Sequence, residues 1–368
     1  MEQYGYSVDV VRSHNLKLIT RLLYKKPMSC KELSGVLGLS ETAIKKNIVQ
    51  LKTHNIITVF EDYTREKKEV GRQHIRFTIN DKFGAFVLID LSHNHDSFLI
   101  KDFKGNDLYY EKLTLGKYIY KKDIFEISDR INDNLKKLGY SVKGIAVAVA
   151  GQVLEETGEI LFSSRMETDV KNIKELLRDY FAIEQIFIKN DLRFCVFGDK
   201  YYLQRSERKN SIYIYVGFGV TCAILEKGKI ISGVNDIAGE IGQSVCADGI
   251  DLHEHCSMEA LMRFYKFASI EECVDCYEKN TDFKKKILES ATILAEKIQI
   301  VCDALGCDEV VLLGDISRFG DDYVNAFYNK INSGICSFKK KVECFNDSTM
   351  RQDGMFEVLK NNIISLIN

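Results

Sequence analysis

Apolar positions in the first 80 residues recur at the three- and four-residue intervals of amphipathic helices. One apolar face runs through residues 15–26 and comprises Leu16, Ile19, Leu22 and Leu23. Another runs through residues 41–55 and comprises Ile44, Ile48 and Leu51. Between them, Ser29 and Glu32 have the spacing of a capping box, which predicts a further helix that runs out at Gly38. The pattern therefore predicts three short helices, the last two joined by a glycine-containing turn.

The spacing changes to that of strands after residue 55. Residues 56–60 form a short apolar run, residues 61–71 form a charged connection, and residues 72–80 alternate apolar and polar side chains. Two short helices followed by strand, loop and strand are typical of a winged helix-turn-helix, whose second helix enters the major groove of DNA. The pattern predicts a DNA-binding unit over residues 1–80.

The distribution of charge agrees with this interpretation. Residues 1–80 contain 14 Lys and Arg against 8 Asp and Glu, whereas the rest of the chain carries a net charge of −8. The candidate DNA-contacting residues of the second helix are Ser40, Glu41, Thr42, Lys45, Lys46 and Gln50. Those of the charged connection, expected at phosphates or in the minor groove, are Arg65, Lys67, Lys68 and Arg72. The alternative is a small helical bundle with a solvated basic face.

From residue 84 onward, apolar runs of strand length alternate with helical segments. Residues 85–91 and 144–151 are such runs, and residues 122–139 have a helical pattern. This alternation predicts an α/β body with a largely parallel sheet, in which ligands bind beyond the carboxyl ends of strands. The strand ends that carry candidate ligand contacts are Asp90, Asn190 with Asp191, and the turn at residues 217–219. At each end the alternative is an ordinary cap or turn.

Length and composition set further bounds. A chain of 368 residues predicts two or three domains. No stretch approaches the roughly 18 uncharged apolar residues of a membrane span, and the first residues do not form a secretion signal. We therefore expect a cytoplasmic protein without membrane contact. The cysteines are odd in number, 11, and scattered along the chain, so we expect reduced thiols.

Motifs in both parts of the chain, by their order and spacing, resemble the ROK family. Near the N-terminus they are RSHNLKLITRLL and LGLSETAIKKNIVQL. In the body they are GIAVAVAGQVLEETGEIL, KNDLRFCVFGD, VGFGVTCAILEKGKIISG, AGEIGQ and LLGDISRFGDDY. This family comprises bacterial repressors, in which a winged helix-turn-helix is fused to a sugar-kinase-like domain, and stand-alone sugar kinases.

The resemblance implies an α/β fold of two domains. Residues 1–80 would form the winged helix-turn-helix, and residues 84–368 a two-lobed, actin/hexokinase-like (ribonuclease H-like) sensor domain. We expect the lobes to divide near residue 190 and a C-terminal helix to return to the first lobe. Because a helix-turn-helix normally reads a two-fold operator in double-stranded DNA, we expect a homodimer or a dimer of dimers.

The sequence departs from the family pattern where the family's kinases bind ATP phosphates. The Asp-x-Gly-x-Thr turn is DLSHN at residues 90–94, with His93 in place of the glycine, and the GTGxGxG loop is GFGVTCA at residues 217–223. Side chains there would crowd a triphosphate and remove amide donors. We therefore expect a regulator that is not an enzyme. The alternatives are an active ATP-dependent kinase of a hexose or amino sugar carrying a DNA-binding head, with Asp191 as catalytic base, and a DNA-binding protein whose sensor binds nothing.

The sugar-binding side of the family pattern is better kept. By resemblance, Asn190, Asp191, Glu240 and Glu259 match sugar-contacting residues, and Gln243 stands where the family has a histidine. Short polar side chains that converge on a cleft suit a polyhydroxylated ligand, since each desolvated hydroxyl needs a partner. The sequence thus predicts a sensor for a sugar or sugar phosphate.

Residues 239–259, GEIGQSVCADGIDLHEHCSME, contain side chains of metal-binding type. In the family, a histidine and three cysteines of this region hold a structural zinc. Here Gln243 replaces the histidine, Cys246 comes too early for the motif, and of the three cysteines only Cys256 remains near its expected position. The sequence predicts that the family zinc site is lost and that no cofactor is bound. An improvised metal site at His253, His255 and Cys256 remains an alternative.

Overall fold

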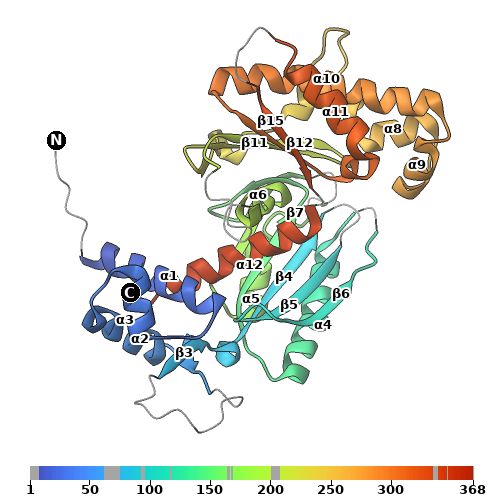
Figure 1. Ribbon diagram of the computed structural model, residues 1–368. Helices are drawn as coiled ribbons and strands as arrows, with labels where there is room; N and C mark the ends of the chain where they lie inside the picture. Colours follow the sequence, from blue (N-terminus) through green and yellow to red (C-terminus); the bar gives the residue numbers. More distant parts are fainter. Residues whose placement is uncertain are drawn as a thin grey trace.

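The structure of this chain is a computed structural model. It describes residues 8–61, 75–92, 96–116, 118–163, 166, 169–199, 208–334, 339–345 and 347–367. These residues form an N-terminal unit and a body of two lobes (Figure 1). None of the helices in the described ranges combines the length and the apolar character that a membrane span requires.

The N-terminal unit consists of helices and a small antiparallel sheet. The helices are α1 (Val8–Lys25), α2 (Cys30–Leu37) and α3 (Glu41–Thr53). The strands, in the order β1-β3-β2, are β1 (Met28–Ser29), β2 (Ile57–Val59) and β3 (Arg76–Ile79). The predicted capping box of Ser29 and Glu32 is confirmed at the start of α2, and Gly38 ends this helix in the left-handed conformation. The predicted apolar face of α3 is confirmed too, because Ile44, Ile48 and Leu51 are buried.

The first lobe is built on a five-stranded sheet in the order β10-β7-β4-β5-β6. Its strands are β4 (Ala85–Leu91), β5 (Ser97–Asp102), β6 (Asp107–Lys112), β7 (Val142–Val149) and β10 (Ile186–Asn190). Helices α4 (Lys121–Leu138) and α5 (Ile173–Phe181) pack on one face, and α12 (Asp347–Ser365) packs on the other. A short turn, η1 (Asp81–Phe83), precedes the sheet, and the hairpin of β8 (Gly151–Leu154) and β9 (Glu159–Ser163) follows β7.

The second lobe repeats this strand order as β13-β12-β11-β14-β15. Its strands are β11 (Ser211–Val216), β12 (Val220–Glu226), β13 (Lys229–Ile230), β14 (Glu309–Leu313) and β15 (Lys341–Phe345). One face carries α7 (Leu252–Cys256), α8 (Met258–Tyr265), α9 (Ile270–Tyr277), α10 (Thr281–Leu305), η5 (Asp315–Phe319) and α11 (Gly320–Ile331). The other face carries α6 (Asp191–Phe197), and the short turns η3 (Val234–Asp236) and η4 (Ile241–Gln243) follow β13. The predicted two-lobed α/β fold is confirmed.

Both sheets differ from the expected, largely parallel arrangement. The first strand of each lobe pairs antiparallel with the second, as β4 does with β5 and β11 with β12. Parallel pairing is restricted to the later strands, as in β4 with β7 and β11 with β14. The connections from β4 to β5 and from β11 to β12 are too short for the crossover that parallel neighbours require, so each pair forms a hairpin.

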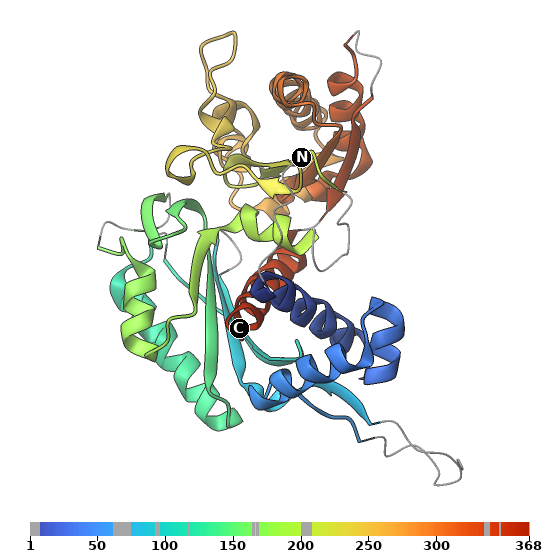
Figure 2. The same cartoon turned by 90° about the vertical axis from the view of Figure 1, so that its left-hand side faces the viewer.

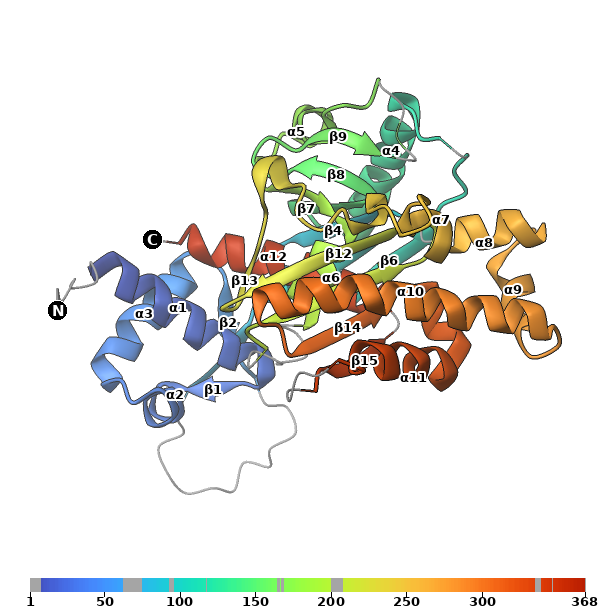
Figure 3. The same ribbon diagram turned by 90° about the horizontal axis from the view of Figure 1, so that it is seen from above.

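Helix α12 connects the parts of the molecule. It follows β15 of the second lobe, runs along the first lobe and ends beside α1 (Figures 1 and 2). The view from above also places the end of α12 next to the N-terminal helices (Figure 3). One hydrophobic core joins Leu16 and Ile19 of α1, Phe86 of β4, and Leu359 and Ile364 of α12. The N-terminal unit is therefore packed on the two-lobed body through the C-terminal helix.

Candidate functional site

A cavity of about 470 Å³, whose wall includes several polar side chains, lies between the two lobes. The first lobe contributes the start of β8 and the end of β10, and α6 begins at the cavity wall. The second lobe contributes the β11–β12 turn, η4 and the segment from α7 to the start of α8. Of the predicted ligand residues, the structure brings Asn190, Asp191, Glu240, Gln243 and Glu259 together here, whereas Asp90 does not line the cavity.

Asn190 and Asp191 are held at the junction of β10 and α6. The Asn190 side chain caps α6 by accepting the Leu192 N–H at 3.0 Å, and its amide nitrogen donates to the Gly151 carbonyl at 3.0 Å. The Asp191 carboxylate accepts the same Leu192 N–H at 2.9 Å. Parallel pairing of β10 with β7 brings this junction beside Gly151, at the edge where ligands bind in such sheets.

Glu240 is positioned by the glycines on either side of it. A side-chain carbon on Gly239 would lie 1.8 Å from the Cys222 carbonyl oxygen, and one on Gly242 would lie 2.4 Å from the Val220 carbonyl oxygen. Only glycine therefore lets this segment lie directly on β12. Burial raises the pKa of the Glu240 carboxyl, while a hydrogen bond from Gln152 and the charge of Arg193 oppose the shift. The site thus holds a partly desolvated acceptor for a ligand hydroxyl.

The segment that follows η4 carries the candidate metal ligands, and their side chains diverge. His253 Nε2 donates to Glu259 Oε2 at 3.0 Å, whereas His255 Nε2 lies 3.0 Å from Asp248 Oδ2. The buried Cys256 thiol faces the Ser290 carbonyl oxygen at 3.4 Å, within the core of the second lobe. In the described ranges, no group of three His, Cys, Asp or Glu side chains converges well enough to hold a metal ion. These donors therefore do not fit the tetrahedral set of a structural zinc.

The strand ends predicted to face a phosphate are engaged with groups of the protein. Asp90 is buried and accepts from Arg351 Nε of α12 at 2.7 Å and from the Ser92 N–H at 3.1 Å. In the β11–β12 turn, a side-chain carbon on Gly217 would lie 2.5 Å from the Tyr215 hydroxyl. The aromatic ring thus packs against the turn, and Phe218 lines the cavity beside it. His93 lies outside the described residues.

Arg193 of α6 bridges the lobes beside the cavity and was not predicted. Its Nη1 donates to Glu155 Oε1 at 2.8 Å and to Asp236 Oδ1 at 3.1 Å, and the Glu155 N–H donates to Asp236 Oδ2 at 3.1 Å. Burial would raise the pKa of the Asp236 carboxyl, but the Glu155 N–H and the Arg193 guanidinium hold it below its ordinary value. This network links the turn after β8 in the first lobe to η3 in the second lobe.

Other lining residues also escaped the sequence analysis. Gln152 follows the buried strand β7 closely, so the rule on strand ends could have found it. The remaining side chains come from strands and loops of both lobes, and no local pattern marks them. They include Tyr118, Phe162, Thr221 and Asp251, and His253, which was predicted only as a metal ligand, also lines the cavity.

The predicted DNA-contacting residues of α3 lie in different environments. Ser40 caps the helix by accepting the Ala43 N–H at 3.2 Å, and Glu41, Thr42, Lys45 and Lys46 are exposed. Gln50 is half-buried: its amide nitrogen donates to the Ile367 carbonyl oxygen beyond the end of α12, and its oxygen accepts from Arg12 Nε at 2.8 Å. Outside the described residues lie Arg65, Lys67, Lys68 and Arg72.

One protein-family model and several curated relatives match this chain. The model of the ROK family matches residues 87–356. The "Xylose repressor" of Bacillus spizizenii is 22% identical over 236 residues, which are 63% of this chain and 60% of that protein. The chain thus spans about 60% of the length of this relative. The "Xylose repressor" of Staphylococcus xylosus is 19% identical over 353 residues, which are 92% of this chain and 89% of that protein.

Solved structures show the same fold. A ROK family transcriptional regulator, described as a homolog of the E. coli MLC protein, has a TM-score of 0.77 and 18% identity, and the match covers 98% of both chains. The ROK hexokinase from Thermus thermophilus has a TM-score of 0.59 and 15% identity, and covers 75% of this chain and 97% of its own. The likeness to the regulator therefore includes the N-terminal unit as well as the body.

Proposed function

This chain belongs to the ROK family, and we propose that it is a bacterial DNA-binding transcriptional repressor that senses a sugar and does not transfer phosphate. The observation that carries the proposal is the connection, in one chain, of a helix-turn-helix unit to an interlobe cavity lined by carboxylates and amides, through the shared core of α12. Relatives named xylose repressors support it, as does the full-length likeness to a transcriptional regulator.

The charges of the cavity favour an uncharged sugar over a sugar phosphate. The lining carboxylates are Asp191, Glu240, Asp251 and Glu259, whereas no lysine or arginine of the described chain lines the cavity. A phosphate group would meet like charges in a partly desolvated site, which costs binding energy. Sugar hydroxyls would instead donate hydrogen bonds to the carboxylates. Because two relatives carry the name xylose repressor, xylose is the first effector to test.

The contacts of Asp90 support the absence of kinase activity. This aspartate occupies the turn at which the family's kinases bind phosphate, and its carboxylate is paired with the buried guanidinium of Arg351. Separating such a buried pair leaves uncompensated charge and is strongly unfavourable. A nucleotide phosphate would therefore have to displace a satisfied ion pair rather than enter a site lined by free amides.

We further propose that α12 couples the cavity to DNA binding. A sugar held by residues of both lobes stabilises one relative position of the lobes, and α12 runs from the second lobe to the N-terminal unit. The ligand shifts the equilibrium between two DNA-binding states by its difference in affinity for them. The repressor acts as a homodimer or a dimer of dimers on a two-fold operator.

The DNA-binding part of the proposal is tested at the exposed face of α3. We expect Lys45→Glu combined with Lys46→Glu to weaken binding to operator fragments, selected from a random library by the unchanged protein, by about tenfold or more. Fluorescence anisotropy measures the affinity. Lys121→Glu combined with Lys122→Glu on the exposed start of α4 is the charge-matched control and should leave it unchanged. Equal affinities for both double variants would refute an interface on α3.

The sensing part is tested by titrating xylose, other pentoses, hexoses and their phosphates into the full chain. A ligand that binds only the folded protein raises its melting temperature. We expect at least one neutral sugar to raise the melting temperature and Asp191→Asn to weaken this effect, since the amide oxygen would still accept the Leu192 N–H but the charge would be lost. A panel without any response would favour a protein whose sensor is inactive.

The alternative is an active sugar kinase with a DNA-binding head. The location of Asp191 in the cavity favours it, because this residue matches the catalytic base of the family's kinases. A coupled assay of ADP release over pentoses, hexoses and amino sugars distinguishes the two functions. ATP-dependent turnover that disappears in Asp191→Ala would overturn the proposal of a non-enzymatic sensor.

A further inference from the structure

The segment at residues 243–258, here called the sensor loop, borders the cavity and corresponds to the region that a metal orders in the family. The three candidate metal donors His253, His255 and Cys256 face Glu259, Asp248 and Ser290 respectively. A cation bound by any one of these three donors would therefore have only that one of them as a ligand. What orders the sensor loop must therefore be found among its other contacts.

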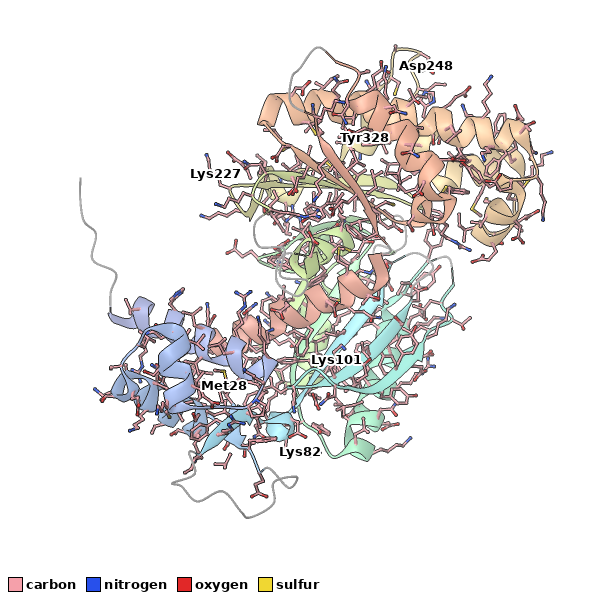
Figure 4. All side chains as sticks on the ribbon, viewed as in Figure 1. Met28, Lys82, Lys101, Lys227, Asp248 and Tyr328 are labelled. Atoms are coloured by element: carbon pink, nitrogen blue, oxygen red, sulfur yellow. The ribbon has the colours of Figure 1, made fainter. Side chains whose placement is uncertain are left out.

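The outer half of the sensor loop, residues 244–252, is held by hydrogen bonds between its own backbone groups. The Cys246 N–H donates to the Ile250 carbonyl at 2.7 Å, and the Leu252 N–H donates to the Ser244 carbonyl at 2.9 Å. Asp248 lies at the outer end of the second lobe, where Figure 4 labels it. Its carboxylate accepts a hydrogen bond from His255 Nε2, which lies 3.0 Å from Oδ2, so this pair connects the tip of the turn to α7. Lys297 of α10 ties the turn to the lobe by donating to the Val245 carbonyl at 2.8 Å.

The inner half of the sensor loop is fixed against the cavity. The Met258 N–H donates to the Gly217 carbonyl at 2.7 Å, which joins the loop to the β11–β12 turn. The His253 ring lies 3.9 Å from the place where a side-chain carbon on Gly219 would stand. From there its Nε2 donates to Glu259 Oε2 at 3.0 Å, while Arg263 approaches Glu259 Oε1 at 3.4 Å. His253 and Arg263 thus determine how the Glu259 carboxylate is presented to the cavity.

We propose that two histidine–carboxylate pairs do in this chain what the metal does in the family. His255 with Asp248 closes the outer half of the sensor loop, and His253 is a positioning residue that orients Glu259 toward the sugar. The first statement concerns the loop alone. The second rests on the proposed function, because it requires that a sugar occupies the cavity.

Hydrogen–deuterium exchange in the full chain tests the outer pair. We expect His255→Ala and Asp248→Ala each to accelerate exchange of amides 244–252 by roughly two- to fivefold, the effect of losing one partly exposed ion pair. Asp248→Ala also removes the hydrogen bond that the Ile250 N–H donates to Asp248 Oδ1 at 3.1 Å, so it should have the larger effect of the two. The double variant should exchange no faster than Asp248→Ala alone, because that variant already removes the interaction with His255. Ser244→Ala, which removes an exposed hydroxyl from the same loop, is the matched control and should exchange as the unchanged protein does. If the effects of the two single variants on exchange add up in the double variant, His255 and Asp248 do not act as a pair.

Metal analysis tests the replacement directly. The purified protein should contain well under one zinc per chain, and treatment with a chelator should leave the exchange rates of amides 244–257 unchanged. One zinc per chain, whose removal accelerates exchange in this segment, would show that a metal orders the sensor loop after all.

Conservative replacement tests the inner pair. His253→Gln keeps an N–H that reaches Glu259, whereas His253→Leu removes it. With xylose as the probe in calorimetric titration, we expect the leucine variant to bind about tenfold more weakly and the glutamine variant to retain most of the affinity. Equal losses in both variants would overturn the positioning role. If the unchanged chain binds neither xylose nor any other sugar, the proposed function and the role of His253 fall together, while the exchange data still decide the outer pair.

Discussion

At the scale of single residues, α12 carries several buried charges that are satisfied in different ways. Arg351 is paired with Asp90, and Lys360 pairs with Glu357 and lies 4.6 Å from the centre of the Tyr24 ring. Asp353 is only 8% exposed, and burial raises the pKa of its carboxyl to about 6, with Glu357 adding to the shift and Lys101 opposing it. Asp353 is thus the buried acid on this helix that resists ionisation.

We expect Asp353→Asn to stabilise the protein at neutral pH. The pKa of about 6 in the folded state exceeds the ordinary value of 3.8, so the folded state binds this proton more tightly than the unfolded chain does. The unchanged protein therefore loses stability as the pH rises from about 4 to about 6 and does not regain it above. The free energy of unfolding at pH 7.5 should be about 1–3 kcal/mol higher in the variant, and the difference should vanish near pH 4.

Urea denaturation followed by circular dichroism at both pH values measures this difference. Asp133→Asn, at a position of α4 on the surface of the first lobe, serves as the control and should alter stability little at either pH. A gain in Asp353→Asn that is the same at pH 4 and at pH 7.5 would contradict the assignment of the shift to burial of this carboxyl.

At the scale of elements, the lobes meet where α6 crosses α12. A side-chain carbon on Gly354 of α12 would lie 1.8 Å from the Phe194 carbonyl oxygen, and one on Gly198 would lie 2.0 Å from the Met350 carbonyl oxygen. The two backbones therefore touch without intervening side chains. On one side of the crossing, Cys195 packs with the sheet of the second lobe, and on the other, Phe194 packs with the first lobe. The α6–α12 contact therefore connects the two lobes.

We expect Gly354→Ala to separate these helices and to destabilise the body by about 2–3 kcal/mol, because rigid backbone atoms must move to admit the methyl group. Gly35→Ala in α2 is the matched control, since no atom lies within 4 Å of the added carbon. It should leave stability unchanged or raise it by about 0.5–1 kcal/mol, as alanine favours helix. Chemical denaturation of both variants compares the effects, and equal stabilities would mean that the crossing relaxes freely.

At the scale of the whole molecule, the N-terminal unit is packed on the two-lobed body. Tyr24 of α1 donates to the Phe103 carbonyl of the first lobe at 2.6 Å, and Gln50 of α3 donates to the Ile367 carbonyl. Ile364 of α12 is buried in the core that these elements share. A movement of α12 would therefore change the contacts that hold α3, the helix that we propose to bind DNA.

We expect Ile364→Ala to uncouple sugar from DNA. The smaller side chain loosens the contact of α12 with α1 but leaves the cavity untouched, so the affinity for the sugar should stay within about twofold. The ratio of DNA affinities without and with sugar should fall by roughly threefold or more, toward one. Fluorescence anisotropy with and without sugar measures this ratio.

Ile287→Ala, in the core of the second lobe, is the control for a loss of the same size at a distance from α1. It should destabilise that lobe and preserve the ratio. If both variants change the ratio equally, the coupling does not run through the end of α12.

Local features of the fold were predictable because they depend on neighbours in the sequence. Ser29 and Glu32 form a capping box within one helical turn, and the apolar spacing of α3 determines which of its faces is buried. The rule on strand ends located Asn190 and Asp191, and the family motif located Glu240. Antiparallel pairing of β4 with β5 was missed, because an apolar run does not reveal the direction of its partner strand.

The sequence by itself thus determined the order of the elements, their buried faces and the family to which the chain belongs. Only the tertiary structure decided which side chains meet. Asp90 and Arg351 lie 261 positions apart, and Gln50 and Ile367 lie 317 apart. His253 and His255 were candidates for one metal until their carboxylate partners were known. The physical reason is that periodicity records whether a position is buried, whereas the partner that covers it depends on how α12 and the two lobes pack together.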